Sequence, residues 1–273
     1  MRLIEGMSNA HAMLQMYKIC MSGPAIESRG MPVRNVPNMA IVFNAVESML
    51  TDFVHRNLNV NYCKREWLWY LGADPKDASI QEHAKMWAKL QQPDGTFFSN
   101  YGQYMFARGD TEGGLSQFEY VIQQLKKDPN SRRASMVLLQ RQHLFDENAD
   151  TVCTYAINFS IHHGYLDMTV MMRSNDVVFG FTNDAFCFWQ LQQFVYAVLS
   201  KTMPALKLGQ YTHITNSMHV YERHFDMLKK ILADGSRKVV KVPQPTGEEA
   251  IELFKTRGQG GDGEYTTWLK TVD

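Results

Sequence analysis

The 273-residue chain has no surplus of charge, because 28 lysines and arginines balance 28 aspartates and glutamates. A protein that binds a polyanion through its surface usually carries a basic excess, so the sequence argues against direct nucleic-acid binding. Apolar runs are also short, and none approaches the roughly 18 residues that a membrane span needs. We therefore expect a soluble globular protein.

Cysteine is scarce and scattered. The chain has 4 cysteines, and none belongs to a Cys-x-x-Cys pair that would predict a redox or zinc site. The 9 histidines show no zinc spacing either, so we expect no metal ion in the chemistry. No signal peptide is recognisable, and together with the isolated cysteines this predicts a reducing, cytoplasmic location.

The length of the chain suits one large α/β domain or two small ones, with a sizeable core, and since no internal repeat is visible we expect a single domain over residues 1–273. The stretch from Tyr155 to Arg173 alternates in character and turns at Gly164, which predicts two antiparallel strands. We interpret residues 24–37, rich in Gly and Pro, as a loop, and the glycine cluster at 258–263 as a flexible connector. Apolar spacing predicts helices over about 10–20, 44–55, 63–71, 114–127, 184–200 and 222–232, and strands over 39–43, 134–140 and near 211.

Cys153 precedes Arg173 by twenty residues, and the two lie at opposite ends of the predicted hairpin sequence. A hairpin of this size can bring the thiol and the guanidinium together at one end of a sheet. A neighbouring cation favours the thiolate, which is the nucleophilic form of cysteine. The alternative is purely structural, because an isolated cysteine is often buried and an isolated arginine often lies on the surface.

Four further motifs accompany this pair in a fixed order. They are the runs 65–70 (Arg-Glu-Trp-Leu-Trp-Tyr), 128–133 (Asp-Pro-Asn-Ser-Arg-Arg), 175–184 (Asn-Asp-Val-Val-Phe-Gly-Phe-Thr-Asn-Asp) and 219–224 (His-Val-Tyr-Glu-Arg-His). Between about residues 27 and 226 the chain resembles the thymidylate synthase family. The run that begins at Asn175 is most similar to the deoxycytidylate hydroxymethylases of T-even phages within that family. Residues 240–273 are poorly covered by the resemblance.

The resemblance implies an α/β fold in which a mixed sheet packs against helices, and a homodimer formed sheet to sheet. It also implies a folate-dependent one-carbon transferase, in which Cys153 adds to carbon 6 of a pyrimidine nucleotide and methylenetetrahydrofolate is the co-substrate. Addition turns carbon 5 into a nucleophile that attacks the one-carbon unit. Water then captures the exocyclic methylene group in the hydroxymethylases, whereas hydride from the folate does so in the synthases.

Asp184 follows Arg173 by eleven residues, where thymidylate synthases carry an asparagine. An amide can donate to a uracil oxygen and accept from its ring N–H, whereas a carboxylate only accepts, which suits the amino group of cytosine. The resemblance therefore implies dCMP as the substrate. Two alternatives stay open: Asp184 caps the following helix, or its neighbour Asn183 reads the base and the substrate is dUMP.

The resemblance assigns roles to other residues of the motifs. Fixed cations suit phosphate recognition, and a buried acid suits proton transfer near neutral pH. The residues implied in nucleotide binding are Arg29, Arg173, Ser174, His219 and Tyr221 from one subunit and Arg132 and Arg133 from its partner. Those implied near the folate are Asp176, Gly180 and Trp87. Glu66 is implied in organising water and proton transfer, and Tyr101 in lying close to the catalytic thiol.

Each motif residue also has a structural explanation. Adjacent arginines are usually solvated, and a His-x-Tyr pair is usually part of a strand surface. Glu66 could face Lys64 or Arg65 on the outside of its helix. For the whole chain, the alternatives to dCMP hydroxymethylation are a dCMP or dUMP methyltransferase, a dUMP hydroxymethylase, and a non-catalytic nucleotide-binding relative.

Overall fold

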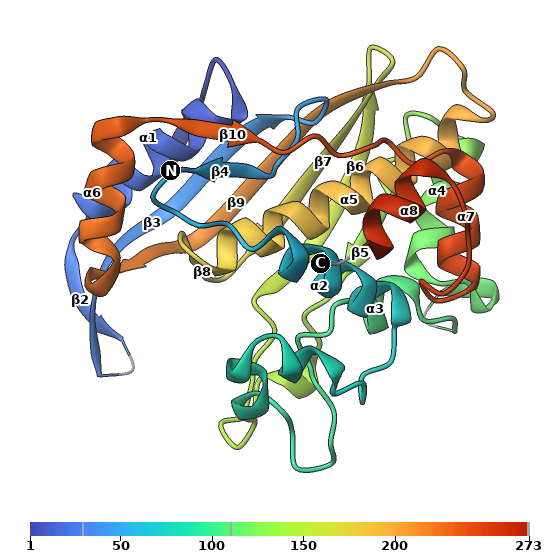
Figure 1. Ribbon diagram of the computed structural model, residues 1–273. Coiled ribbons are helices and arrows are strands. Elements are labelled where there is room, and N and C mark those ends of the chain that lie inside the picture. Colours follow the sequence, from blue (N-terminus) through green and yellow to red (C-terminus); the bar gives the residue numbers. More distant parts are fainter. Residues whose placement is uncertain (29, 110, 272–273) are drawn as a thin grey trace.

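The computed structural model describes residues 1–28, 30–109 and 111–271, which fold into a sheet covered by helices (Figure 1). The strands are β1 Arg2–Glu5, β2 Ala25–Ser28, β3 Met31–Asn44, β4 Thr51–Phe53, β5 Ser135–Val137, β6 Thr154–His162, β7 Tyr165–Met172, β8 Asn175–Asp176, β9 Lys207–Tyr221 and β10 Arg237–Val239. The helices are α1 Asn9–Met21, α2 Val60–Gly72, α3 Gly102–Phe106, α4 Gln117–Lys127, α5 Gly180–Ser200, α6 Phe225–Asp234, α7 Gly247–Lys255 and α8 Glu264–Lys270.

One mixed sheet of eight strands organises the part of the chain that the structure describes. Its main path is β1-β3-β9-β7-β6-β5, with β2 beside β3 and β8 beside β9. The pairs β1–β3 and β7–β9 are parallel, whereas β3–β9, β6–β7 and β5–β6 are antiparallel. The expected mixed sheet packed with helices is therefore confirmed.

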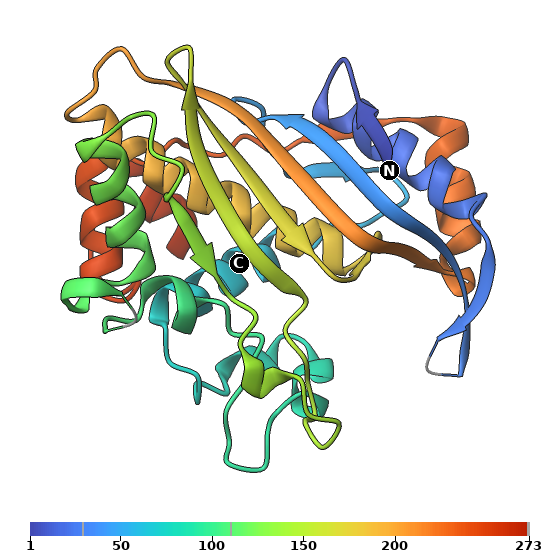
Figure 2. The same cartoon turned by 180° about the vertical axis from the view of Figure 1, so that it is seen from behind.

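Helix α5 is the centre of the layer that covers one face of this sheet (Figure 1). Its side chains are buried almost all the way round, as expected for a helix enclosed by a sheet and by other helices. It packs against α2, α4 and α7. Neither α5 nor any other helix within the described ranges is long and apolar enough to cross a membrane. Figure 2 shows the opposite face, where no helix of the described residues covers the central strands.

The predicted hairpin around Gly164 is confirmed. Strands β6 and β7 pair from Thr154 opposite Met172 to His162 opposite Tyr165. Gly164 has φ of 81° in the connecting turn, a left-handed conformation that glycine adopts without steric cost. The nucleophile candidate lies just before β6 and its arginine just after β7, so both lie at the same end of the hairpin.

Two local predictions are wrong. Residues 24–37 are not simply a loop, because 25–28 form β2 and 31–37 form the first half of β3, which continues to Asn44 in register with β9. Residues 44–55 are not a helix. The Asn44 side chain accepts from the Val46 backbone N–H at 3.0 Å, and the Ser48 hydroxyl accepts from Leu50 at 3.1 Å. Such local bonds compete with helix formation, and β4 then pairs with β10.

The ends of the other elements differ from prediction in two useful ways. Helix α5 begins at Gly180 rather than at Asp184, so Asp184 is not its N-cap. Strand β9 is one long strand rather than a short one near Tyr211. The described residues of the poorly covered tail, 240–271, form α7 and α8, and the predicted glycine connector lies between these two helices.

Gly102 allows the close approach of α3 to α2. A Cβ atom at position 102 would lie 1.7 Å from the backbone oxygen of Tyr70, far inside van der Waals contact. We predict that Gly102→Ala destabilises the fold by about 1–3 kcal/mol, measured by thermal or denaturant unfolding. Gly72→Ala is the control, since a Cβ there meets nothing within 4 Å. Equal stability of the two variants would contradict this packing argument.

Candidate active site

Cys153 and Arg173 are brought together by the β6–β7 hairpin, as predicted. The Arg173 backbone N–H donates to the Cys153 carbonyl at 2.8 Å. The Arg173 guanidinium donates to the Val152 carbonyl at 3.1 Å and also to the carbonyl of Thr151. Cys153 is half-buried at this edge. The arginine is therefore fixed by the same short segment that carries the thiol.

Glu66 is buried in the helix layer rather than on the surface of α2. Its side chain is 3% exposed, and Oε1 accepts from the Tyr70 hydroxyl at 3.1 Å. Burial, and then the charge of Asp184, raise the pKa of Glu66 to about 8. Its second oxygen, Oε2, has no hydrogen-bond partner among the described residues. The alternative in which Glu66 faces solvent beside Lys64 or Arg65 is wrong.

Asp184 lies in the second turn of α5 and faces β8. Its Oδ2 accepts from the side-chain amide of Asn175 at 2.7 Å. Burial raises the pKa of Asp184 to about 7, while this hydrogen bond favours the ionised form and opposes the shift. Two acids of raised pKa thus lie within electrostatic reach of each other, an arrangement that is common at catalytic sites.

The neighbouring Asn183 points elsewhere. Its Oδ1 accepts from the Cys63 thiol on α2 at 3.3 Å. Successive residues of a helix are rotated by about 100°, so Asn183 and Asp184 meet different partners. It is Asp184 whose charge acts on both Glu66 and Tyr101.

Tyr101 packs into the same region. Its ring stacks on Tyr70 at 5.4 Å and on Phe188 at 5.8 Å between centroids. Burial, followed by the charges of Asp184 and Cys153, raises the pKa of Tyr101 well above its ordinary value. The phenol is therefore neutral and lies within electrostatic reach of both the base-reading candidate and the thiol.

Ser174, His219 and Tyr221 lie along the edge formed by β8 and β9. The Ser174 hydroxyl is 3.5 Å from His219 Nδ1, and the rings of His219 and Tyr221 meet edge to face at 5.5 Å. The two residues therefore face the same side of β9, as predicted.

Asp176, opposite His219 in the β8–β9 ladder, accepts from the backbone N–H groups of Val178 and Phe179, each at 3.1 Å.

The other predicted residues differ in where they lie relative to these groups. Arg132 and Arg133 are exposed in the connection from α4 to β5, and Arg29 lies outside the described residues. Trp87, in the short helix Lys85–Lys89, is 6% exposed. Its Nε1 donates to the Tyr62 hydroxyl at 2.8 Å.

Gly180 begins α5, and a Cβ there would lie 3.5 Å from the Asn175 amide nitrogen.

Sequence reasoning missed two residues at this site. Asn175, on β8, donates to Asp184. Tyr62 accepts from Trp87, and the charge of Glu66 helps to raise the pKa of Tyr62. The helical spacing of Tyr62 and Glu66 on α2 was the available signal for the second. No comparable spacing links Asn175 to Asp184. Within the described ranges, no group of three or more His, Cys, Asp or Glu side chains could hold a metal ion.

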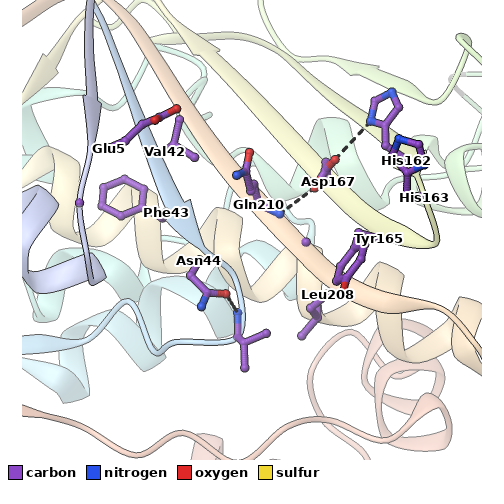
Figure 3. Close-up of a pocket in the computed structure, with 13 residues that line it drawn as sticks. Glu5, Val42, Phe43, Asn44, His162, His163, Tyr165, Asp167, Leu208 and Gln210 are labelled. Atoms are coloured by element: carbon purple, nitrogen blue, oxygen red, sulfur yellow. Dashed lines mark hydrogen bonds and ion pairs between the residues drawn. The ribbon is translucent and has the colours of Figure 1, made fainter.

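A cavity of about 860 Å³ opens at the other end of the hairpin (Figure 3). Asp167 lies in its wall, and its Oδ2 is 3.2 Å from His162 Nδ1. Its Oδ1 accepts a hydrogen bond from the Gln210 backbone N–H at 2.7 Å. At about 3.3 Å per residue, the length of β6 separates this cavity from Cys153 by roughly 25–30 Å. None of the predicted site residues lines it.

The pH dependence of stability tests the buried acid. A carboxyl whose pKa is raised on folding, here from 4.5 to about 8, stabilises most below its ordinary pKa. That contribution to stability is lost as the pH rises towards the pKa that Glu66 has in the folded protein. We predict that Glu66→Gln, which stays neutral, gains on the order of 2 kcal/mol relative to wild type between about pH 5 and pH 8. The exposed Glu82→Gln is the control in the same unfolding titrations, and a gain from Glu66→Gln that does not change with pH would contradict the assignment.

The half-buried thiol of Cys153, the fixed arginine and the two buried acids of raised pKa make up the candidate active site. The family model described as thymidylate synthase matches residues 13–257, and the chain belongs to that family. Members of this family are folate-dependent one-carbon transferases, and the chain is an enzyme of this kind.

Individual relatives point to two activities. The deoxycytidylate 5-hydroxymethyltransferases of Enterobacteria phages T6 and T4 are each 30% identical over 200 residues, which cover 69% of this chain and 78% of each relative. The thymidylate synthase of Bacillus atrophaeus is 31% identical over 165 residues, 60% of this chain and 70% of the relative. Thermostable thymidylate synthase A from Bacillus subtilis has the same fold, with a TM-score of 0.71 at 23% identity over 89% of this chain and 90% of that one.

Proposed function

We propose that the enzyme transfers a hydroxymethyl group to carbon 5 of dCMP, with methylenetetrahydrofolate as the one-carbon donor. The observation that carries this proposal is the buried carboxyl of Asp184, held by Asn175 at 2.7 Å beside the acid Glu66. A buried carboxylate accepts hydrogen bonds and cannot donate them. It therefore pairs with the amino group of cytosine and opposes the carbonyl oxygen of uracil.

The cost of a mismatch supports this preference. When uracil replaces cytosine, its exocyclic oxygen faces the Asp184 carboxylate, and neither atom has a hydrogen to share. A buried polar group left without a partner costs about 1–3 kcal/mol, or more when it is charged. Sites built on such pairs discriminate strongly between otherwise similar substrates.

The chemistry begins at Cys153. Its thiolate adds to carbon 6 of the base, and carbon 5 of the resulting enamine bonds to the methylene carbon of the folate. Loss of the carbon 5 proton and departure of tetrahydrofolate leave an exocyclic methylene group. Water adds to that group, and elimination of the Cys153 thiolate from carbon 6 releases 5-hydroxymethyl-dCMP.

Glu66 is the residue that we assign to water and proton transfer. Its Oε2 has no partner among the described residues, so it can take a hydrogen bond from water beside the base. A pKa of about 8 lets one carboxyl both give and accept a proton near neutral pH. Tyr101, neutral and close to the thiol, is a second proton carrier for the removal of the carbon 5 hydrogen.

The turn from β8 to α5 suits the folate. Phe179 is 49% exposed, and an exposed aromatic face offers a stacking surface. Asp176 lies three residues earlier with its carboxylate fixed by backbone N–H groups, and Gly180 keeps the backbone accessible beside it. Trp87, almost fully buried, would border the folate only at its rim. We propose this turn as the folate side of the site.

The nucleotide phosphate requires several cations. Arg173 is bound through its backbone to Cys153 and is one candidate, and we assign Ser174, His219 and Tyr221 on the neighbouring strands to the sugar. Arg132 and Arg133 are exposed and free to reach a second subunit. We propose that they complete the phosphate site of a partner across a sheet-to-sheet homodimer.

The helix-free face of the sheet supports this dimer. One cross-strand row on that face consists of Leu3, Ala40, Ile214 and Met171. Leu3 is 59% and Met171 41% exposed. An apolar row across an open sheet face is the kind of surface that a second sheet covers.

A mixing experiment tests the shared site. Arg132→Ala/Arg133→Ala and Cys153→Ala are each expected to be inactive as homodimers. Co-expressed or refolded together, they form heterodimers with one site that keeps both the thiol and the arginines, so about a quarter of wild-type activity returns. Two Cys153→Ala chains with different tags serve as the control. Failure of the mixture to recover activity, with heterodimers present, would contradict the shared site.

The second candidate function is methylation of carbon 5 of the base. Thymidylate synthases at 30–34% identity are as similar to the chain as the phage enzymes are. Water capture releases tetrahydrofolate, whereas hydride transfer oxidises the folate to dihydrofolate. The test is chromatographic identification of the folate product after turnover with dCMP. Tetrahydrofolate supports hydroxymethylation, and stoichiometric dihydrofolate would overturn it in favour of methylation.

A further inference from the structure

Asn175 is a buried residue of β8 with an unusual hydrogen-bond state. Its side chain is 4% exposed. The amide nitrogen donates to Asp184 Oδ2 at 2.7 Å and lies 3.5 Å from the sulfur of Met172. The amide oxygen, Oδ1, has no hydrogen-bond partner among the described residues. Buried amide oxygens in folded proteins nearly always have a partner, so this one is available to accept a hydrogen bond from a bound ligand.

The orientation of the amide is fixed by its surroundings. The nitrogen faces a carboxylate oxygen and a thioether sulfur, both of which accept hydrogen bonds. Rotation of the amide by half a turn would place its oxygen 2.7 Å from the Asp184 carboxylate, where like partial charges repel. The present orientation and the ionised carboxylate therefore stabilise each other, and Oδ1 is directed away from Asp184.

The backbone on both sides of this contact is also constrained. Asn175 pairs with Met218 in the β8–β9 ladder, and Asp184 lies in the second turn of α5. The first residue of that helix, Gly180, lies beside both groups. A Cβ there would be 3.5 Å from the Asn175 nitrogen and 3.8 Å from Asp184 Oδ2. Neither side chain can move far without moving a strand or a helix.

We propose that Asn175 is a specificity-determining residue for the base, acting with Asp184 as a pair of hydrogen-bond acceptors. The Asn175 N–H occupies Oδ2 of Asp184 and leaves Oδ1 of that carboxylate to accept from a 4-amino group. That amino group has two hydrogens, and the unpartnered oxygen of Asn175 accepts the second, directly or through one water. A 4-keto base offers no hydrogen at position 4 to either acceptor. The inference rests on the proposed dCMP activity and deepens it.

The test compares base preference in three variants. Asn175→Ala removes both hydrogen bonds, and Asn175→Leu does so while keeping the volume of the side chain. Gln193→Ala is the matched control, because Gln193 is also a buried amide with an unpartnered oxygen, on the same helix as Asp184, but its nitrogen donates to the Ala45 carbonyl at 2.9 Å. The measured quantity is the ratio of kcat/KM for dCMP to that for dUMP.

We expect both Asn175 variants to lower this ratio at least about tenfold, and Gln193→Ala to leave it unchanged. Thermal unfolding of each variant shows which are folded, and Asn175→Leu keeps the test open if the alanine variant is unstable. Calorimetric binding of dCMP and dUMP in a Cys153→Ala background separates recognition from chemistry.

The outcomes separate this inference from the proposed function. A wild-type enzyme that prefers dUMP would refute the proposed function itself. A wild-type preference for dCMP that survives in a folded Asn175 variant would refute only the role of Asn175. If both variants fail to fold, the wild-type enzyme is compared on dCMP and N4-methyl-dCMP, which keeps a single amino hydrogen, and equal kcat/KM values for the two would overturn the inference, since one hydrogen satisfies only one acceptor.

Discussion

Cys153→Ala is expected to lower turnover by at least about 10⁴-fold, because no other residue at the site can form the bond to carbon 6 of the base. The remaining thiols of the chain, Cys20, Cys63 and Cys187, are buried. Burial raises the pKa of each, that of Cys20 to about 12. None of them supplies a thiolate at neutral pH.

The measurements are product formation and the exchange of the carbon 5 hydrogen with solvent. Exchange requires addition at carbon 6, so it reports on the nucleophile even when no folate is present. Cys20→Ala is the control, because Cys20 is a fully buried residue of α1 rather than of the hairpin that carries Cys153, and its replacement should leave kcat nearly unchanged. A loss of less than about a hundredfold in Cys153→Ala would place the nucleophile elsewhere.

The same variant addresses the non-catalytic alternative. If the chain served only to bind nucleotide, Cys153→Ala would keep its whole function, and the wild-type protein would show no hydrogen exchange. The backbone contact of Arg173 with Cys153 and the electrostatic effect of Cys153 on Tyr101 favour a catalytic role. Exchange catalysed by the wild type and absent from the variant would exclude a purely binding protein.

Asp184→Asn is expected to shift the preference from dCMP towards dUMP, with a change of about a hundredfold or more in the ratio of kcat/KM values. The amide can donate to the uracil oxygen and accept from its ring N–H, whereas the carboxylate can only accept. The change is nearly isosteric, so the fold should persist. Loss of the charge also removes one cause of the raised pKa of Glu66, and the alkaline limb of the rate profile should move to lower pH.

Asn183→Ala is the matched control for the neighbouring position. Asn183 is bound by the Cys63 thiol and should have little influence on which base is used. The assignment would be wrong if Asp184→Asn kept the original preference while Asn183→Ala changed it. That result would make Asn183 the base-reading residue.

The parts of the site that sequence could predict are those carried by short-range structure or by ordered motifs. Alternation around Gly164 predicts the hairpin, and the hairpin alone brings Cys153 to Arg173. The helical pattern of α2 predicts that Glu66 lies in an apolar setting. The role of Asp184 came from the family resemblance, and its electrostatic effect on Glu66 required the structure, since nothing local relates α2 to α5.

Other features required the tertiary structure. The start of α5 is set by the Asp176 carboxylate, which binds the N–H groups of Val178 and Phe179 and turns the chain into the helix four residues earlier than apolar spacing suggests. Strand β3 tolerates Pro32 and Pro37 because long pairing with β9 outweighs local preference. The contact between Asn175 and Asp184 depends on how β8 sits beside α5, which no sequence spacing reveals.

In the proposed reaction a carboxylate selects cytosine and water captures the methylene group. Both properties are tested by incubating the enzyme with methylenetetrahydrofolate and either dCMP or dUMP, and by measuring the masses of the nucleotide products by mass spectrometry. We expect the mass gain of a hydroxymethyl group on dCMP and no product from dUMP. A methyl gain would contradict water capture, and product from dUMP alone would contradict base selection by Asp184.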